Sequence, residues 1–399
     1  MTDAAHTPYL GLAPFLRASI AGVDLRPLAQ QSLLAVQQGP TNAAHWMNLS
    51  TLLFSLDQRE AAFACQREAL ALTRLFSIPP ESGIRRRLLL ICIAGDIAAN
   101  TPLDCLLEGT DIELLYYFAT LEAPLPDPCP PHDALFMACG YSTEHAPLLQ
   151  RLVEHLAHWP VPVLNHPARL QRTERDQASA CLANLPGVLM PRNLAVSRTA
   201  LAEIAQGAIS AQATFALDFP LIIRPLDSHA GRDLARLDTL AALSDYLAAH
   251  PQPDFFVAPF IDYRSADGQY RKFRIALVRG QAFAAHLAIR DHWMIHYLNA
   301  GMYENAAKRA EEAAFMAGFS DFAARHREAL AAIAERMGLE YVCFDGAELP
   351  DGRLLIFEID HVMVVHAMDP IDLFPYKPAA IQKIMEAFRQ LLEPSAHIA

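Results

Sequence analysis

Three acidic residues near the C-terminus, Asp345, Glu358 and Asp360, have the pattern of a cation-binding site. Asp345 ends the apolar run 341–345, and the other two close the run 354–360. Pro, Asp and Gly lie between the runs, so we predict two strands joined by a tight turn. Residues two apart in a strand share a face, which brings the carboxylates together. Oxygen ligands of this kind favour Mg²⁺, and the alternative is a pair of surface strands with solvated acids.

A basic segment lies earlier in the chain. The apolar run 219–223 is predicted to be a strand that delivers Arg224 to the start of a small-residue loop. Such loops let backbone N–H groups approach an anion closely, and guanidinium groups pair with phosphate oxygens. The candidate anion-binding residues here are Arg224, Ser228, His229, Gly231 and Arg232. The alternative is a surface loop that carries an unrelated arginine.

A second basic pair, Lys272 and Arg274, lies in an apolar run that is predicted to be a strand. Alternation places both side chains on the same face of that strand. Basic side chains that face inward from a strand are costly unless they meet anions. The alternative is an edge strand whose basic side chains are solvated.

The composition is that of a globular protein. The chain has 399 residues, of which 53% are hydrophobic and 19% are charged. The net charge of −12 argues against non-specific binding to nucleic acids or anionic membranes. No apolar run is long enough to span a bilayer, and the N-terminus lacks the pattern of a signal peptide. Seven scattered cysteines without a CxxC pair fit a reducing compartment, so we expect a cytoplasmic protein without a nucleic-acid or membrane partner.

Three regions follow one another along the chain. Residues 1–80 are predicted to be helical, and 42–72 hold one hairpin whose large and small residues are arranged as in a tetratricopeptide repeat. An ordinary helical hairpin is the alternative. Residues 85–185 alternate strands with helices, which favours a mostly parallel sheet. Residues 186–399 hold the basic strands, a long helical span over 304–338 and the acidic hairpin, so the predicted fold class is α/β with an N-terminal all-α region.

The order of these segments resembles the ATP-grasp ligase superfamily, in which a cation-bearing strand with a glycine loop precedes an arginine-bearing strand and then Asp…Glu-x-Asp. The resemblance covers about 186–395 and is strongest to RimK-like proteins with a tetratricopeptide-like N-terminus. The region from 85 onwards resembles the α/β domain that precedes the ATP-grasp domain. The resemblance implies ATP and Mg²⁺, with Mn²⁺ as an alternative ion. It places phosphate binding on residues 224–232, the transferred phosphate on Arg274, and metal ligation on the acidic trio.

Several positions depart from the family pattern. Arg224 stands where lysine is usual, and Asp360 stands where asparagine is usual. The acid that commonly holds the adenosine has no counterpart before Asp262. An earlier phosphate-binding cation would come from Arg172 or Arg175. The implied catalytic residues are Arg274, Arg224 and Lys272.

Histidines and aromatic residues gather between the basic strands and the acidic hairpin. His292 and His296 are four apart, but no glutamate follows His292, so the zinc-protease motif is absent. We expect His286, His292 and His296 to line a substrate pocket, with zinc binding and core packing as alternatives. Lys377 is a candidate to reach a substrate carboxylate, and a solvated lysine is its alternative.

The resemblance implies an ATP-dependent carboxylate–amine ligase that acts through an acyl phosphate and releases ADP. Its substrates would be small-molecule or peptide carboxylates and amines, and the helical N-terminal region is a candidate site for a protein or peptide partner. Two alternatives stay open at this point. One is a catalytically degenerate scaffold with the same fold, and the other is a small-molecule kinase.

Overall fold

The structure is a computed structural model that describes residues 8–81, 83–226, 228 and 231–393. Four helices open the described chain, namely α1 (Ala13–Ile20), α2 (Arg26–Gln38), α3 (Ala43–Ser55) and α4 (Arg59–Leu72). Helices α3 and α4 form the predicted hairpin, because Ala62 and Ala69 of α4 are fully buried and Ser50 of α3 donates to the carbonyl of Ala62 at 2.8 Å. Its assignment as a tetratricopeptide repeat stays a prediction.

The first sheet follows these helices and has the order β1-β3-β2-β4-β5. Its strands are β1 (Leu75–Ile78), β2 (Arg86–Cys92), β3 (Ile112–Phe118), β4 (Ala134–Met137) and β5 (Val163–Leu164). The strands from β2 to β5 are parallel, as predicted, and helices α5 (Leu103–Leu106) and α6 (Ala146–Leu156) connect them. Residues 75–78, expected in the helical region, instead form an antiparallel edge strand on β3.

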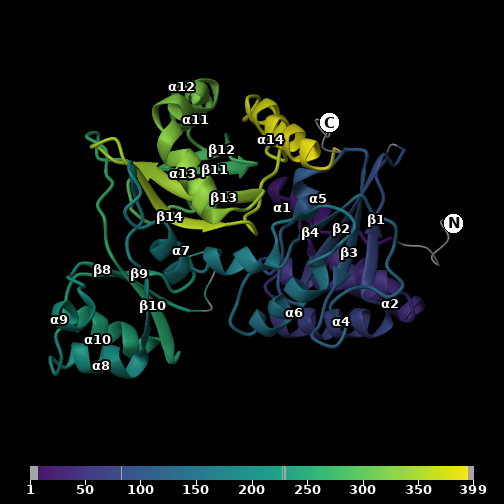
Figure 1. The fold of residues 1–399 in the computed structure, drawn as a ribbon, viewed down its shortest axis with the longest axis horizontal. Helices are drawn as coiled ribbons and strands as arrows, with labels where there is room; N and C mark the ends of the chain where they lie inside the picture. The colour runs from purple at the N-terminus through teal and green to yellow at the C-terminus, as the bar shows by residue number, and fades with distance from the viewer. Residues whose placement is uncertain (1–7, 82, 227, 229–230, 394–399) are drawn as a thin grey trace.

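Two further sheets build the C-terminal half (Figure 1). The smaller sheet is antiparallel, with the order β7-β10-β8-β9, and the larger has the order β12-β11-β13-β14-β6. The smaller one contains β7 (Leu194–Ser197), β8 (Leu221–Pro225), β9 (Ala235–Leu237) and β10 (Asp254–Pro259). The larger one contains β6 (Val188–Leu189), β11 (Tyr270–Val278), β12 (Gln281–Arg290), β13 (Tyr341–Glu348) and β14 (Leu354–Asp360). The predicted α/β class is therefore confirmed.

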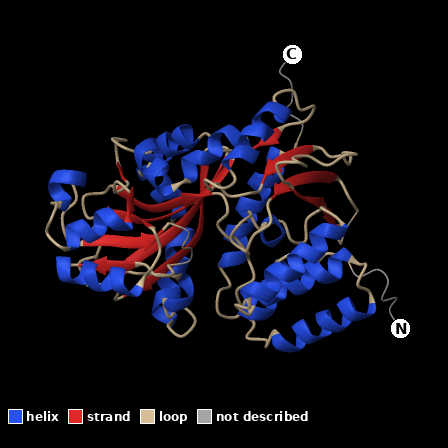
Figure 2. Cartoon of the chain, turned by 90° about the horizontal axis from the view of Figure 1, so that it is seen from below, coloured by secondary structure: helices blue, strands red, loops and turns tan. Residues whose placement is uncertain are grey.

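Helices cover the outer faces of both sheets (Figures 1 and 2). Helices α8 (Arg198–Ala205), α9 (Ala211–Phe215) and α10 (Leu240–Ala249) accompany the smaller sheet. The larger sheet is accompanied by α7 (Arg175–Cys181) with the preceding 3-10 turn η2 (Pro167–Thr173), by η3 (Tyr297–Asn299), and by α11 (Ala306–Ala317), α12 (Phe319–Arg325), α13 (Arg327–Met337) and α14 (Lys377–Leu391). The long helix expected over 304–338 is thus three helices. None of the helices in the described part of the chain is long and apolar enough to cross a membrane.

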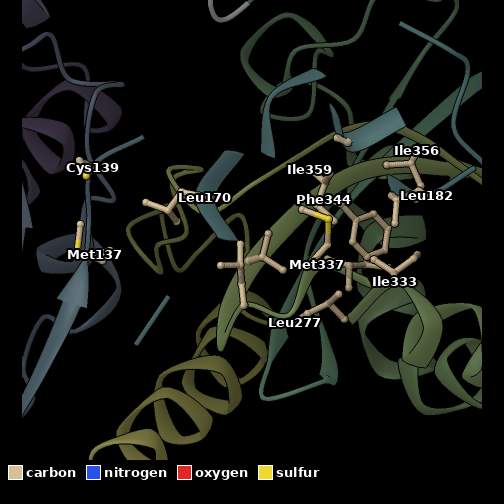
Figure 3. Packing of buried hydrophobic residues seen from close by; sticks show 14 of the residues in the cluster. Met137, Cys139, Leu170, Leu182, Leu277, Ile333, Met337, Phe344, Ile356 and Ile359 are labelled. Atoms are coloured by element: carbon tan, nitrogen blue, oxygen red, sulfur yellow. The ribbon is translucent and has the colours of Figure 1, made fainter. Parts of the chain in front are cut away.

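One face of the larger sheet is apolar, and the other carries the charged residues. We call the second the polar face, although Ala276 and Val278 at its far end are buried in another apolar cluster. In β11, Phe273, Ile275 and Leu277 alternate with Lys272 and Arg274. The apolar set packs in one buried cluster with Phe344 of β13 and with Ile333 and Met337 of α13 (Figure 3). Since successive strand residues point to opposite faces, burial of the apolar set fixes the basic residues on the other face.

Gly346 marks a close approach between β13 and its neighbours. A Cβ at this position would lie 2.6 Å from the carbonyl oxygen of Leu355 and 3.0 Å from the Phe273 ring. We expect Gly346→Ala to lower the free energy of unfolding by roughly 1–3 kcal/mol, because neither neighbour has space to yield. Urea unfolding measures the loss, with Gly83→Ala as control because a Cβ there meets nothing within 4 Å. Equal stabilities of the two variants would contradict the assignment of a tight contact.

Candidate active site

The acidic hairpin forms as the sequence predicts. Strands β13 and β14 pair antiparallel, with Asp345 opposite Glu358 and Cys343 opposite Asp360. The β13–β14 pairing register shifts between Asp345 and Gly346. Cross-strand partners share a face, so the backbone places the three acids on the polar face of the sheet.

Asp345 is held by both basic residues of β11. Its carboxylate accepts from Lys272 Nζ at 2.7 Å and from Arg274 Nε and Nη2 at 2.7 and 3.1 Å. Arg274 also donates to the carbonyl of Val364 at 2.8 Å. Burial by itself raises the pKa of Asp345, but Arg274 and Lys272 outweigh burial and hold that pKa far below its usual value. Asp345 is therefore ionised at all ordinary pH values.

This ion-pair set predicts a pH dependence of stability. The folded pKa of Asp345 is depressed, so its contribution is complete above the unfolded pKa of about 3.9 and is lost as the pH falls below it. We expect Asp345→Asn to destabilise the protein most above pH 5. Below about pH 3.9 the difference from the unmodified protein should shrink by up to roughly 1.4 kcal/mol per pH unit. Urea unfolding of both proteins from pH 7 to pH 3 measures it, and a constant difference would refute the pairing.

The other two acids have partners of their own. Glu358 forms an ion pair with Arg175 at the start of α7. Asp360 accepts from the backbone N–H of His361 at 2.7 Å. Among the described residues, no group of three or more His, Cys, Asp or Glu side chains is arranged to hold a metal ion. The trio fits Mg²⁺ in donor type and in shared sheet face, but ion pairs engage two of its members, so ligation by the trio stays a prediction.

Arg224 is a buried guanidinium at the end of β8. Arg224 is only 7% exposed. Its guanidinium donates to the Oγ of Ser228 at 3.0 Å and to the Ser228 carbonyl. No carboxylate in the described part of the chain lies within 4 Å of it. Burial, and next the positive charge of Arg175, lower the pKa of Arg224 to about 10. A buried cation that lacks an acidic partner is a candidate anion site.

The remaining residues of the predicted anion loop are placed only in part. Gly231 has a φ of +73°, a left-handed conformation that favours glycine, and a Cβ there would lie 4.0 Å from the sulfur of Met294. Arg232 is exposed in the same loop. His229 lies outside the described residues. The loop therefore starts at the buried Arg224–Ser228 pair and approaches the segment after β12.

The three predicted substrate histidines differ in setting. His286 of β12 lies opposite Arg274, and its ring is 4.9 Å from that of Tyr297. Burial, followed by Arg274, holds the pKa of His286 well below its usual value. Burial and then Lys272 also lower the pKa of His296. His292 is exposed, and its Nδ1 accepts from the backbone of Met294 at 3.2 Å. Both His286 and His296 are thus near the basic residues of β11.

Lys377 is buried, so the alternative that it is a solvated surface lysine is wrong. Its Nζ lies 2.8 Å from Asp369 and 2.5 Å from the hydroxyl of Tyr297, and it is 3.6 Å from Glu312. Tyr376 donates to Glu312 at 2.7 Å. The buried carboxylates offset the charge of Lys377 in this structure, so its role toward a substrate stays a prediction.

The sequence reasoning missed Glu312 and Asp369. Glu312 is fully buried on α11 and shares the inner face of that helix with Met316, four residues later. That i, i+4 spacing with an apolar residue was a signal that Glu312 faces inward. Asp369 lies in an irregular segment, and no periodic pattern marks it.

Comparison with known proteins gives solved structures only. No family model and no curated protein matches the chain. The chain is similar to the ATP-grasp ligase PsnB, solved with precursor peptide PsnA2 and AMPPNP, at 12% identity and a TM-score of 0.42, over 78% of this chain and 99% of that one. It is similar to a RimK domain ATP-grasp protein of Sphaerobacter thermophilus at 15% identity and a TM-score of 0.40, over 75% and 98%. It is also similar to the D-alanine–D-alanine ligase of Bacillus anthracis, solved with ATP, at 12% identity and a TM-score of 0.43, over 75% and 98%.

Proposed function

We propose that the protein is an ADP-forming, ATP-grasp-like carboxylate–amine ligase. The observation that carries the proposal is Arg224, a buried guanidinium without a carboxylate partner. Arg175 lies close enough to lower the pKa of Arg224, and Glu358 is the acid that offsets the positive charges of both arginines. Two arginines that share one acid bind a polyanion such as a triphosphate favourably, because the anion removes their repulsion.

The residues of the site would divide into two sets. Arg175, Arg224, Ser228, Gly231 and Arg232 would hold the phosphates of ATP, together with His229. Asp345, Glu358 and Asp360 would ligate Mg²⁺, which when bound offsets the charge of the phosphates. Binding of the nucleotide would free Glu358 from Arg175, since each then has a partner of opposite charge.

Arg274 would act on the chemical step. A carboxylate is a poor electrophile, and transfer of the terminal phosphoryl group of ATP converts it into an acyl phosphate. Negative charge develops on the transferred group, and a guanidinium that is already oriented lowers the barrier without further reorganisation. Its bonds to Asp345 and to the carbonyl of Val364 fix that orientation. An amine then attacks the acyl carbon and releases phosphate.

We propose amino acids or short peptides as the substrates, with the helical N-terminal region as a site for a peptide partner. On and beside α2, Val23, Leu33 and Leu34 expose 46–54% of their surface, which is the kind of surface that a peptide can cover. The substrates would reach the polar face of the larger sheet, where His286 and His296 lie near Arg274.

Two measurements test the proposal. Thermal melting should show stabilisation by ATP that requires Mg²⁺, since binding to the folded state raises its stability. Incubation with ATP, Mg²⁺, hydroxylamine and a pool of amino acids and dipeptides should yield hydroxamates, which report acyl phosphates. Stabilisation by ATP without ADP release would support the scaffold instead, and a stable phosphorylated product without hydroxamate would support the kinase.

A further inference from the structure

The ring of His286 has a polar atom that nothing in the described structure satisfies. Its Nε2 is buried and has no hydrogen-bond partner among the described residues. An unpaired buried polar atom loses its hydrogen bonds to water without replacement, so folded proteins rarely keep one without a use. A ligand that forms a hydrogen bond to this nitrogen would remove the cost.

The position of His286 relates it to the proposed chemistry. It lies directly opposite Arg274 in the β11–β12 register, and Arg274 lies opposite Asp345 in the β11–β13 register. Three neighbouring strands thus present an imidazole, a guanidinium and a carboxylate in one row across the polar face. The reacting carbon would lie beside Arg274, so His286 is the next side chain along the row.

The groups around His286 decide its protonation. Arg274 and Lys272 face it from β11, Asp345 from β13 and Lys377 from α14, while the Tyr297 ring packs on it from η3. Burial disfavours the charged ring, and three cations against one carboxylate act in the same direction, so the pKa of His286 is lowered. The imidazole is therefore neutral at physiological pH and has a lone pair available.

We propose that His286 is the proton acceptor for the amine that attacks the activated carboxyl carbon, an inference that rests on the proposed ligase function. The lone pair of the neutral amine forms the new C–N bond. The bond between the acyl carbon and the phosphate oxygen breaks, and its electron pair leaves with phosphate. One N–H proton passes from the amine to His286, which later releases it to solvent. The atoms and charges balance without any further reactant.

The test separates activation of the acid from attack of the amine. Hydroxylamine is largely unprotonated and strongly nucleophilic at neutral pH, so it captures an acyl phosphate without a base. We expect His286→Gln to keep hydroxamate formation within about threefold of the unmodified protein. With the pool of amino acids and dipeptides and no hydroxylamine, amide formation should fall at least about 100-fold, the lower end for loss of a general base. His158→Gln is the matched control, because His158 is exposed and lies between α6 and β5 of the first sheet.

Each outcome bears on the inference. Equal losses in both reactions would place His286 at the phosphoryl step or in folding, and unchanged amide formation would exclude it as a base; both overturn the proposal. If the unmodified protein yields neither hydroxamate nor amide, the ligase function fails, and the inference fails with it. His286→Asn gives the same comparison if the glutamine variant does not fold.

A readout without turnover is also available. In long-range ¹⁵N–¹H NMR spectra, the imidazole signals that His286→Gln removes should be those of a neutral ring at pH 6.5, where an ordinary histidine is half protonated. A protonated ring at that pH would overturn the assignment.

Discussion

Arg274→Met is expected to lower the rate of hydroxamate formation at least about 100-fold, the scale for removing one group that stabilises developing charge. Asp345 and the Val364 carbonyl hold the guanidinium in place, so no free energy is needed to orient it during the reaction. Arg274→Lys keeps the positive charge but loses the planar guanidinium, which can donate two parallel hydrogen bonds. This variant should therefore recover only part of the rate. The measurement is ATP-dependent hydroxamate formation with the same substrate pool.

The control for this prediction is Arg271→Met on the same strand. Arg271 pairs with Asp267 and Glu311 at the partly exposed end of β11, away from the row of Asp345, Arg274 and His286. Pairs of this kind contribute at most about 1 kcal/mol, so activity and stability should change little. Equal activity losses for the Arg271 and Arg274 variants would show that the loss comes from damage to the strand and would refute a catalytic role for Arg274.

Lys377→Met is expected to give the largest loss of stability, roughly 3–5 kcal/mol, the scale for removing one partner of a buried ion pair. Lys377 is 3% exposed, Asp369 is 8% exposed and Glu312 is fully buried, so water cannot replace the lost ammonium group. The Lys377 Nζ also lies 4.0 Å from the centre of the Tyr297 ring, and the substitution removes that contact as well. Urea unfolding at pH 7 measures the difference.

Lys383→Met on the same helix is the matched control, because Lys383 is exposed. The double variant Lys377→Met with Glu312→Gln should recover part of the loss, since it leaves one fewer buried charge unpaired. A Lys377 variant as stable as the Lys383 variant would show that the buried network does not hold η3 and α14 together.

The acidic hairpin shows how far the sequence determines the site. Apolar runs with acids at their ends, joined by Pro, Asp and Gly, were sufficient to predict β13, β14 and the shared face of Asp345, Glu358 and Asp360. Alternation in β11 likewise predicted a common face for Lys272 and Arg274, and both now lie against Asp345. These inferences needed only the geometry of a strand, which every strand shares.

The partners of the same residues could not be read from the chain. Arg175 and Glu358 are 183 positions apart, and Lys272 and Asp345 are 73 apart. No local pattern predicts which cation pairs with which acid, because the pairing depends on how α7 and the strands pack. Lys377 is the clearest example, since a lysine that begins an amphipathic helix is usually solvated, yet this one is buried by Asp369 and Glu312.

The sequence by itself determined the α/β class, the acidic hairpin and the faces of its strands, because hydrophobic alternation and turn residues act over a few neighbouring positions. Only the tertiary structure decided that Arg224 is buried without an acid, that Glu358 pairs with Arg175, and that His286 keeps an unpartnered nitrogen opposite Arg274. The reason is that burial and charge pairing are properties of the packed elements together, and distant segments supply most of the groups that surround each side chain.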